Sequence, residues 1–155
     1  MELLFLRLLL LYNIVIAYVV GLHPRENATH QAFLDSFFNS EDLKYCYYIY
    51  RINVTQGVDD YETSRMNGQL LAQKYVLPDS LNKNLTLLVD VHSNAGNWLE
   101  NEFMFSPLNN SQSEIIVKEI LKNCTFSTYY FPPNPTSHVY LTLPLNEAGT
   151  PAFFL

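Results

Sequence analysis

Residues 14–26, IVIAYVVGLHPRE, decide the fold of this chain, because an apolar run leads there directly into a polar corner. Residues 14–20 are β-branched or aromatic apart from Ala17, which is typical of a buried strand. Pro24 presets the backbone for a first helical turn, so a helix is expected to follow. Open α/β sheets bind ligands at the carboxyl ends of their strands. The corner therefore predicts a site at the end of the first strand.

Two side chains at this corner suit a metal ion. His23 and Glu26 are three residues apart, so an imidazole and a carboxylate could reach one cation. Both are ordinary zinc ligands, and a catalytic zinc site needs three protein ligands with one position left for water. A His-x-x-Glu pair also occurs by chance in many chains, so a solvated turn is the alternative interpretation.

The composition is that of one globular domain. The chain has 155 residues, of which 48% are hydrophobic and 15% are charged, which suffices for a single sizeable core. The formal net charge of −6 and the lack of a basic run argue against a nucleic-acid partner, which needs clustered Lys and Arg. Cys46 and Cys124 are distant in the sequence, which predicts neither a disulfide framework nor a Cys-type zinc site and favours the reducing cytoplasm.

Residues 3–22 are almost entirely apolar and leave two interpretations open. A run of about 20 such residues could cross a bilayer and anchor the protein in a membrane. The second half is β-branched, however, whereas the first half is rich in leucine. We expect an α/β domain over residues 13–155 that begins with a buried strand, and an apolar leader or extra helix over residues 1–12. A membrane anchor through residues 3–22 is the alternative.

The rest of the chain alternates between helical and strand patterns. Helices are expected after Glu26, from Tyr61 to Pro78, and from a capping box at Ser111, and the second of them would carry Met66 and Leu70 on its apolar face. Strands are expected over residues 45–54, 84–91, 126–131, 139–143 and 152–155. This alternation predicts a three-layer α/β fold, with a mostly parallel or mixed sheet covered by helices on both faces.

A second strand end repeats the chemistry of the first. The strand expected over residues 84–91 leads into His92, and neighbouring parallel strands end at the same edge of a sheet. His92 could therefore join His23 and Glu26, with a surface loop as the alternative interpretation. Asp90 lies on the same side of this strand and could accept a hydrogen bond from the His92 ring, which would fix its tautomer. The alternative for Asp90 is a buried residue that caps a neighbouring loop.

Together, Gly-x-His-x-x-Glu after the first strand and Asp-x-His-Ser at the later strand end resemble motifs of the zinc carboxypeptidase superfamily. The likeness is to its succinylglutamate desuccinylase and aspartoacylase branch, especially short uncharacterised archaeal members, and it covers residues 14–155. It implies that His23, Glu26 and His92 hold one zinc ion on an eight-stranded α/β sheet. It also implies a hydrolase that cleaves an amide bond next to a carboxylate, in a small peptide or an acylated amino acid.

The same resemblance implies how a substrate would be held. Arg65 lies where relatives carry an Asn-Arg pair that grips the substrate carboxylate, and a guanidinium can bind a carboxylate through two hydrogen bonds. Ser64 replaces the expected Asn, which leaves Asn67 as a substitute. The alternative for Arg65 is a solvated helix residue paired with Glu62. Arg25, which lies between His23 and Glu26, could bind the substrate carboxylate instead.

The general base is the main departure from the family pattern. In relatives a glutamate at the end of the last core strand takes the proton, and this chain stops at Leu155, about two residues short of that position. We therefore expect a C-terminally truncated version of the fold, with Glu147 as the nearest replacement base. The alternative function is a non-catalytic metal- or partner-binding domain, whose interface the many aromatic residues would suit.

Two further histidines are candidates for the site. His30 follows Glu26 by one helical turn and could act as a ligand or support one, although such a residue is more often merely half-buried. His138 follows the proline-rich loop and could line a pocket, with a surface loop position as the alternative.

Overall fold

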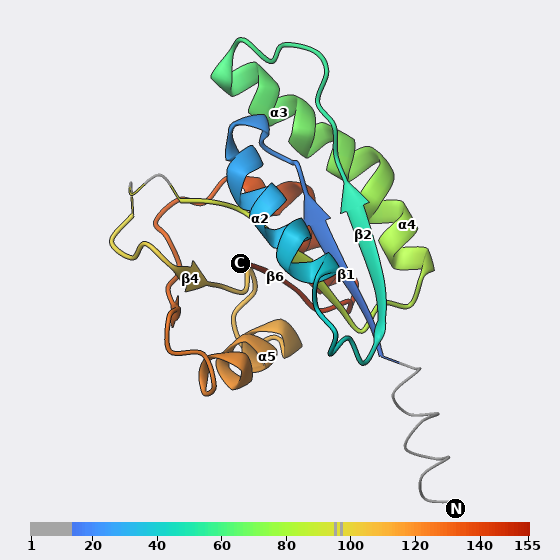
Figure 1. Cartoon of the computed structure of the whole chain (residues 1–155), viewed down its shortest axis with the longest axis vertical. Coiled ribbons are helices and arrows are strands. Elements are labelled where there is room, and N and C mark those ends of the chain that lie inside the picture. The colour runs from blue at the N-terminus through green and yellow to red at the C-terminus, as the bar shows by residue number, and fades with distance from the viewer. Residues whose placement is uncertain (1–13, 95, 97) are drawn as a thin grey trace, which may run out of the picture.

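The structure, a computed structural model, describes residues 14–94, 96 and 98–155, and its centre is a parallel sheet (Figure 1). This four-stranded sheet has the strand order β2-β1-β3-β6. Its strands are β1 (Val15–Val20), β2 (Cys46–Arg51), β3 (Leu87–Asp90) and β6 (Ala152–Phe154). A two-stranded parallel sheet, β4 (Phe103–Met104) with β5 (Thr128–Tyr129), joins it through an antiparallel bridge between Phe105 and Phe154.

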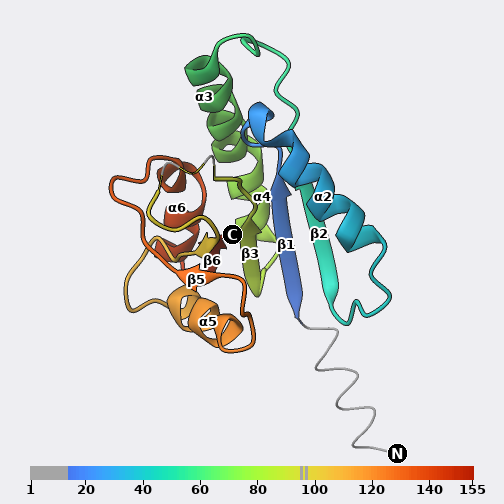
Figure 2. The same ribbon diagram turned by 60° about the vertical axis from the view of Figure 1, so that its left-hand side comes forward.

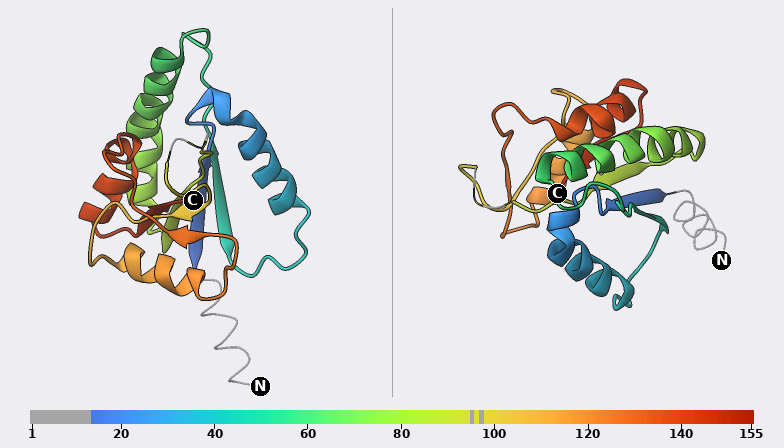
Figure 3. Two further views of the ribbon diagram at one scale, coloured as in Figure 1. Left: turned by 90° about the vertical axis from the view of Figure 1, so that its left-hand side faces the viewer. Right: turned by 90° about the horizontal axis from the view of Figure 1, so that it is seen from above.

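Helices cover both faces of the main sheet (Figures 2 and 3). The helices and short helical turns are η1 (Pro24–Glu26), α2 (Asn27–Phe38), α3 (Tyr61–Leu71), η2 (Ala72–Val76), α4 (Leu77–Asn82), α5 (Gln112–Leu121), η3 (Ser137–Tyr140) and α6 (Thr142–Glu147). Leu34 of α2 and Val117 of α5 belong with Val89 to the hydrophobic core on one face. Val76 of η2 and Leu145 of α6 share the core of the opposite face. The expected α/β class with a mostly parallel sheet is confirmed.

The side chains of the central strands alternate between the two cores. Val19 of β1 and Leu88 of β3 belong to one core, whereas Val20 and Val89 belong to the other. A strand that is buried on both faces reads as a continuous apolar run, which explains the β-branched pattern. Among the described residues the main sheet has four strands, compared with the eight that the family resemblance implies.

The apolar run near the N-terminus contains the central strand, as expected. β1 pairs with both β2 and β3, so a membrane anchor through residues 3–22 is wrong for the part that forms this strand. The leader or extra helix expected over residues 1–12 lies outside the described residues. Within the described part of the chain, no helix combines the length and apolar character that crossing a membrane requires.

The strand expected over residues 139–143 is wrong, because this segment forms η3 and the start of α6. Its apolar residues alternate as in a strand, yet Leu141 and Leu145 are both fully buried and are spaced by one helical turn. Pro144 lies in the first turn of α6, where a missing N–H leaves no hydrogen bond unmade. Packing of two leucines against the sheet therefore overrides the local strand pattern.

The helix from Tyr61 also differs from its prediction at Pro78. The chain continues through the π-helical turn η2 into α4, whose first turn holds Pro78, so the proline does not end the helical segment. Met66 and Leu70 are exposed, and the buried face instead carries Ser64 and Gly68. Small residues let α3 approach the sheet more closely than the expected large apolar residues would.

Two glycines allow the chain to pack tightly at the corner after β1. A Cβ atom at Gly68 would lie 1.7 Å from the backbone oxygen of Leu22, so α3 touches the corner backbone itself. Gly21 has a φ of +89°, and a Cβ there would lie 2.1 Å from the backbone oxygen of Ile52. These two contacts fix the path of the chain into His23.

The variant Gly68→Ala should be less stable than the wild type. Alanine favours a helix by about 1 kcal/mol over glycine, but the backbone clash with Leu22 should cost about 3 kcal/mol as overpacking does. The net loss should lower the midpoint of urea unfolding followed by circular dichroism. Leu70→Ala, an exposed change on the same helix, is the matched control. An unchanged midpoint for Gly68→Ala would contradict the close approach.

Candidate metal centre

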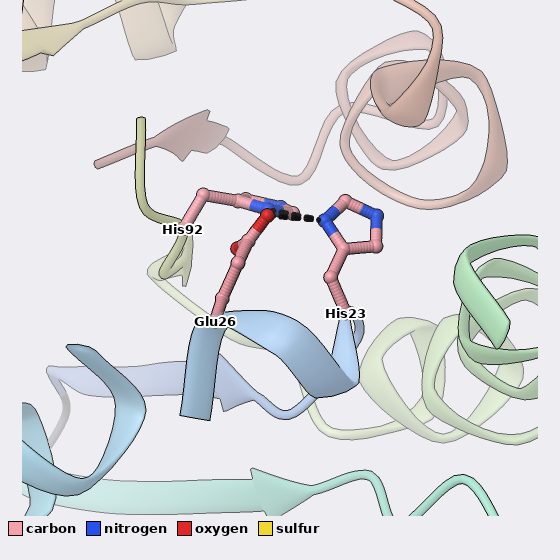
Figure 4. A group of neighbouring side chains, drawn as sticks. All are labelled: His23, Glu26 and His92. Carbon is pink, nitrogen blue, oxygen red and sulfur yellow. Dashed lines mark hydrogen bonds and ion pairs between the residues drawn. The ribbon is translucent and has the colours of Figure 1, made fainter. Parts of the chain in front are cut away.

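His23, Glu26 and His92 meet at the carboxyl edge of the sheet (Figure 4). The Nδ1 atom of His23 lies 2.8 Å from Oε1 of Glu26 and 3.2 Å from Nδ1 of His92. The Nδ1 atom of His92 lies 3.1 Å from Oε2 of Glu26. The structure thus brings together the three residues that the sequence analysis selected as metal ligands.

The pairing of β1 with β3 causes this convergence. Val19 is in register with Asp90, so the two strands end at the same level of the sheet. His23 follows β1 through the Gly21 turn, and Glu26 follows it within η1. His92 follows β3, where its backbone N–H donates to the carbonyl of Leu155 at 2.9 Å. Two backbone segments, one after β1 and one after β3, therefore supply the group.

The separation of the three donor atoms suits a single metal ion. Bonds of about 2.0 to 2.2 Å in a tetrahedron place neighbouring ligand atoms about 3.3 to 3.5 Å apart. One donor atom from each residue lies within 4.8 Å of the other two. The closest contacts are 3.2 Å between the two Nδ1 atoms, 2.8 Å from His23 to Oε1 of Glu26 and 3.1 Å from His92 to Oε2, so a small adjustment of the side chains would admit an ion. These side chains could therefore hold a metal ion through two imidazole nitrogens and a carboxylate.

The electrostatics of the group favour a bound cation. Burial raises the pKa of Glu26, but its contacts with His23 and His92 outweigh burial and hold that pKa well below the usual range. Burial lowers the pKa of His92, whereas the negative charges of Asp90 and Glu26 raise it to about 10. For His23, burial outweighs the hydrogen bond to Glu26 and lowers the pKa. A proton on His92 thus supplies positive charge to the site, and a metal ion would replace that proton.

Asp90 lies behind His92, as the sequence analysis expected. Its carboxylate is fully buried, and its Oδ2 atom lies 3.1 Å from Nε2 of His92 as an ion pair. Among the described residues, no hydrogen bond reaches either carboxylate oxygen. A buried carboxylate needs a charged or donating partner, so Asp90 and the His92 ring depend on each other for position.

His30 supports the group and is not one of the three converging ligands. Its side chain is buried, and its Nε2 atom lies 3.0 Å from the carbonyl oxygen of Val91. The same nitrogen lies 3.8 Å from Oε2 of Glu26. His30 therefore connects α2 to the residue before His92, which keeps Glu26 beside the end of β3.

Gln69 and Ser137 are site residues that the sequence analysis missed. Both are buried, and Gln69 Nε2 donates to Ser137 Oγ at 3.1 Å and lies 3.3 Å from Nε2 of His23. A metal on Nδ1 of His23 requires the ring proton on Nε2, where an amide oxygen can accept it. A half-turn of the Gln69 amide exchanges its nitrogen and oxygen and provides that acceptor. No sequence signal marked these two ordinary polar residues.

Arg65 reaches the metal centre from α3. Its Nη1 atom lies 3.2 Å from Nδ1 of His23, and its Nη2 atom donates to Ser137 Oγ at 2.6 Å. The guanidinium is therefore held in place by a buried hydroxyl beside the candidate ligands. Arg65 is not the solvated helix residue of the alternative interpretation.

The remaining candidates lie at the cleft or away from it. Arg25 and His138 line the cleft, and the Arg25 guanidinium also lies 5.2 Å from the centre of the Tyr61 ring. Asn67 does not line it, and its amide donates instead to the carbonyl of Gln56 at 3.0 Å. Glu147 is exposed at the end of α6 and also lies outside the cleft lining.

The candidate metal centre opens into a cleft of about 1130 Å³. Its walls come from η1, α3, the segments after β3 and around β4, and the proline-rich segment before η3. No protein-family model, curated protein or solved structure matches this chain. The resemblance to zinc carboxypeptidases therefore stays a prediction.

The stability of the metal-free protein should fall as pH rises from neutrality towards 10. The His92 pKa is about 10 in the folded protein, compared with an ordinary value of 6.5, so its contribution to stability is complete below pH 6.5 and is lost progressively between pH 6.5 and about 10. Glu26 acts in the opposite direction, because its lowered pKa makes its contribution disappear as pH falls below 4.5. Urea unfolding in the presence of a chelator, repeated across this pH range, would measure both the alkaline and the acid loss of stability.

The variant His92→Gln should lose most of the alkaline decline between pH 6.5 and 9. His138→Gln is the matched control, since burial lowers the pKa of His138 and its titration affects only the acid side. An alkaline decline that persists unchanged in His92→Gln would show that other groups cause it.

Gln69→Leu should weaken metal binding by about 10- to 100-fold, because a ligand histidine loses the partner that orients its ring. Competition with a chromogenic chelator would measure the affinity. Gln73→Leu, an exposed change in η2, is the control and should leave it unchanged. Equal affinities for Gln69→Leu and the wild type would exclude an orienting role.

Proposed function

We propose that this protein is a zinc-dependent hydrolase that cleaves an amide bond next to a carboxylate. The observation that carries the proposal is the convergence of the two histidines and Glu26 at a large cleft: the two Nδ1 atoms lie 3.2 Å apart, and each lies within 3.1 Å of one of the two Glu26 carboxylate oxygens. Two histidines and one glutamate form a ligand set of zinc peptidases, in which the metal polarises the scissile carbonyl and activates a water.

The donor atoms favour zinc over the common alkaline-earth ions. Magnesium and calcium take oxygen ligands, whereas two of the three donors here are imidazole nitrogens. Imidazole also suits copper, iron and nickel, so the identity of the metal needs direct measurement. Three protein ligands would leave a position towards the cleft for water and substrate.

Arg65 would receive the negative charge of the substrate. Its guanidinium lies 3.2 Å from a candidate ligand atom of His23, and Ser137 holds one of its nitrogens. A guanidinium in a partly buried site binds a carboxylate, or the oxyanion that develops on a carbonyl, more strongly than in water. The position of Arg65 thus supports a substrate that carries a carboxylate near the scissile bond.

The proposed hydrolysis also needs a carboxylate that accepts the proton of the attacking water. Apart from Glu26, the glutamates that line the cleft among the described residues are Glu62 and Glu102. The family resemblance would place the base shortly after Leu155, which also lines the cleft. The reading frame beyond codon 155 tests this expectation. A glutamate within the next few codons supports the hydrolase, and another sequence favours a non-catalytic metal-binding domain.

The purified protein should contain close to one zinc ion per chain, and His92→Ala should reduce this to less than about a tenth, because two ligands cannot hold the ion. Elemental analysis by mass spectrometry would measure the content after equilibration with zinc and removal of excess. His138→Ala, which changes a cleft histidine outside the group of three, should retain the metal. A wild-type protein without metal would refute the proposal.

A further inference from the structure

A wall of aromatic rings begins at the metal centre and runs along the cleft. The ring of Phe154 stacks on His92, with centroids 4.8 Å apart and an interplanar angle of 26°. Phe105 stacks in turn on Phe154 at 4.7 Å and 5°, and Phe103 lies 6.2 Å from Phe105. All three phenylalanines line the cleft.

The backbone makes this wall rigid. Phe105 and Phe154 exchange two hydrogen bonds, of 3.2 and 3.0 Å, across the antiparallel bridge that joins the two sheets. Phe105 and Phe154 are largely buried and only border the cleft, because His92 and Phe105 stack on the Phe154 ring. Phe103 is half-buried, and Trp98 and Phe126 are exposed in the same lining. Together these rings give the part of the cleft beside His92 an apolar aromatic lining.

Arg65 and the aromatic wall lie on opposite sides of the metal centre. The Arg65 guanidinium contacts His23, whereas the Phe154 ring contacts His92. Figure 4 shows the same arrangement, with the helix α3 towards His23 and the strand β6 towards His92. A substrate whose scissile carbonyl lies at the metal would therefore have one end at Arg65 and the other on the phenylalanines.

The charges around the wall argue against an acidic group there. Among the described residues that line the cleft from Val91 to Thr136, no lysine or arginine is present. The acidic residue in that part of the lining is Glu102, next to Phe103. A succinyl or similar acidic acyl group would thus face a negative charge without a cation to balance it.

We propose that the substrate is an N-acyl amino acid whose acyl group is large, apolar and preferably aromatic. Its carboxylate would bind Arg65, and its acyl group would lie in the part of the cleft that Phe103, Phe105 and Phe154 border. This inference rests on the proposed hydrolase function. Water would supply a hydroxyl to the acyl carbon as the carbon–nitrogen bond breaks, and the leaving nitrogen would take a proton. The products are an aromatic carboxylic acid and a free amino acid.

Binding can be measured without turnover, because Trp98 is the one tryptophan of the 155-residue chain and lines the cleft. Its fluorescence should change when zinc-loaded protein is titrated with N-phenylacetylglycine. N-acetylglycine and N-succinylglycine should each bind at least about tenfold more weakly, since added apolar groups in a matching pocket have effects of this size. N-phenylacetylglycinamide, which lacks the carboxylate, should also bind more weakly.

Variants distinguish the effect of the aromatic wall on ligand preference from general effects on the fold. Phe105→Leu and Phe103→Ala should reduce the preference for phenylacetyl over acetyl to less than about threefold, because each removes a ring that the aromatic acyl group would contact. Phe103→Ala alters a half-buried side chain and keeps the test valid if Phe105→Leu does not fold. Phe38→Ala, an exposed change on α2, is the control and should retain the full preference.

Zinc content measured on the same samples distinguishes the two proposals. Absence of zinc would refute the hydrolase function itself. With zinc bound, equal or tighter binding of the acetyl or succinyl compound would overturn only the aromatic acyl group. With zinc bound, failure of all four compounds to bind at millimolar concentration would also overturn the proposed aromatic acyl group.

Discussion

The parallel pairing of β1 with β3 is the constraint on which the rest of the molecule depends. Its register, with Val19 opposite Asp90, brings the segments after both strands to the same edge of the sheet. There His23 and His92 converge on Glu26 although they come from distant parts of the chain. The helix α3 can approach this edge because Gly68 has no side chain, and it brings Arg65 and Gln69 to the site.

Charge balance explains why these residues need one another. Two largely buried carboxylates, Glu26 and Asp90, flank the His92 ring, and this environment raises the His92 pKa to about 10. Buried carboxylates without positive charge nearby would destabilise the fold. The same arrangement that keeps a proton on His92 is suited to a divalent ion. The contacts that stabilise this part of the fold are therefore the same ones that could hold a metal ion.

Several features were predictable from the sequence because they depend on neighbouring residues. The apolar runs predicted the central strands, and the capping box at Ser111 predicted the start of α5. The local signals failed over residues 139–143, where packing of Leu141 and Leu145 selects a helix instead of a strand. They also failed at Pro78, because a π-helical turn before it lets the helical segment continue.

The sequence by itself determined the α/β class and the chemistry of the three donor residues, since periodicity and residue type are local properties. The tertiary structure alone decided which polar residues serve the site. It placed Gln69 and Ser137 beside His23 and Arg65, and it left Asn67 and Glu147 outside the cleft. The physical reason is that strand register and helix approach are set by contacts between distant segments, which no local pattern records.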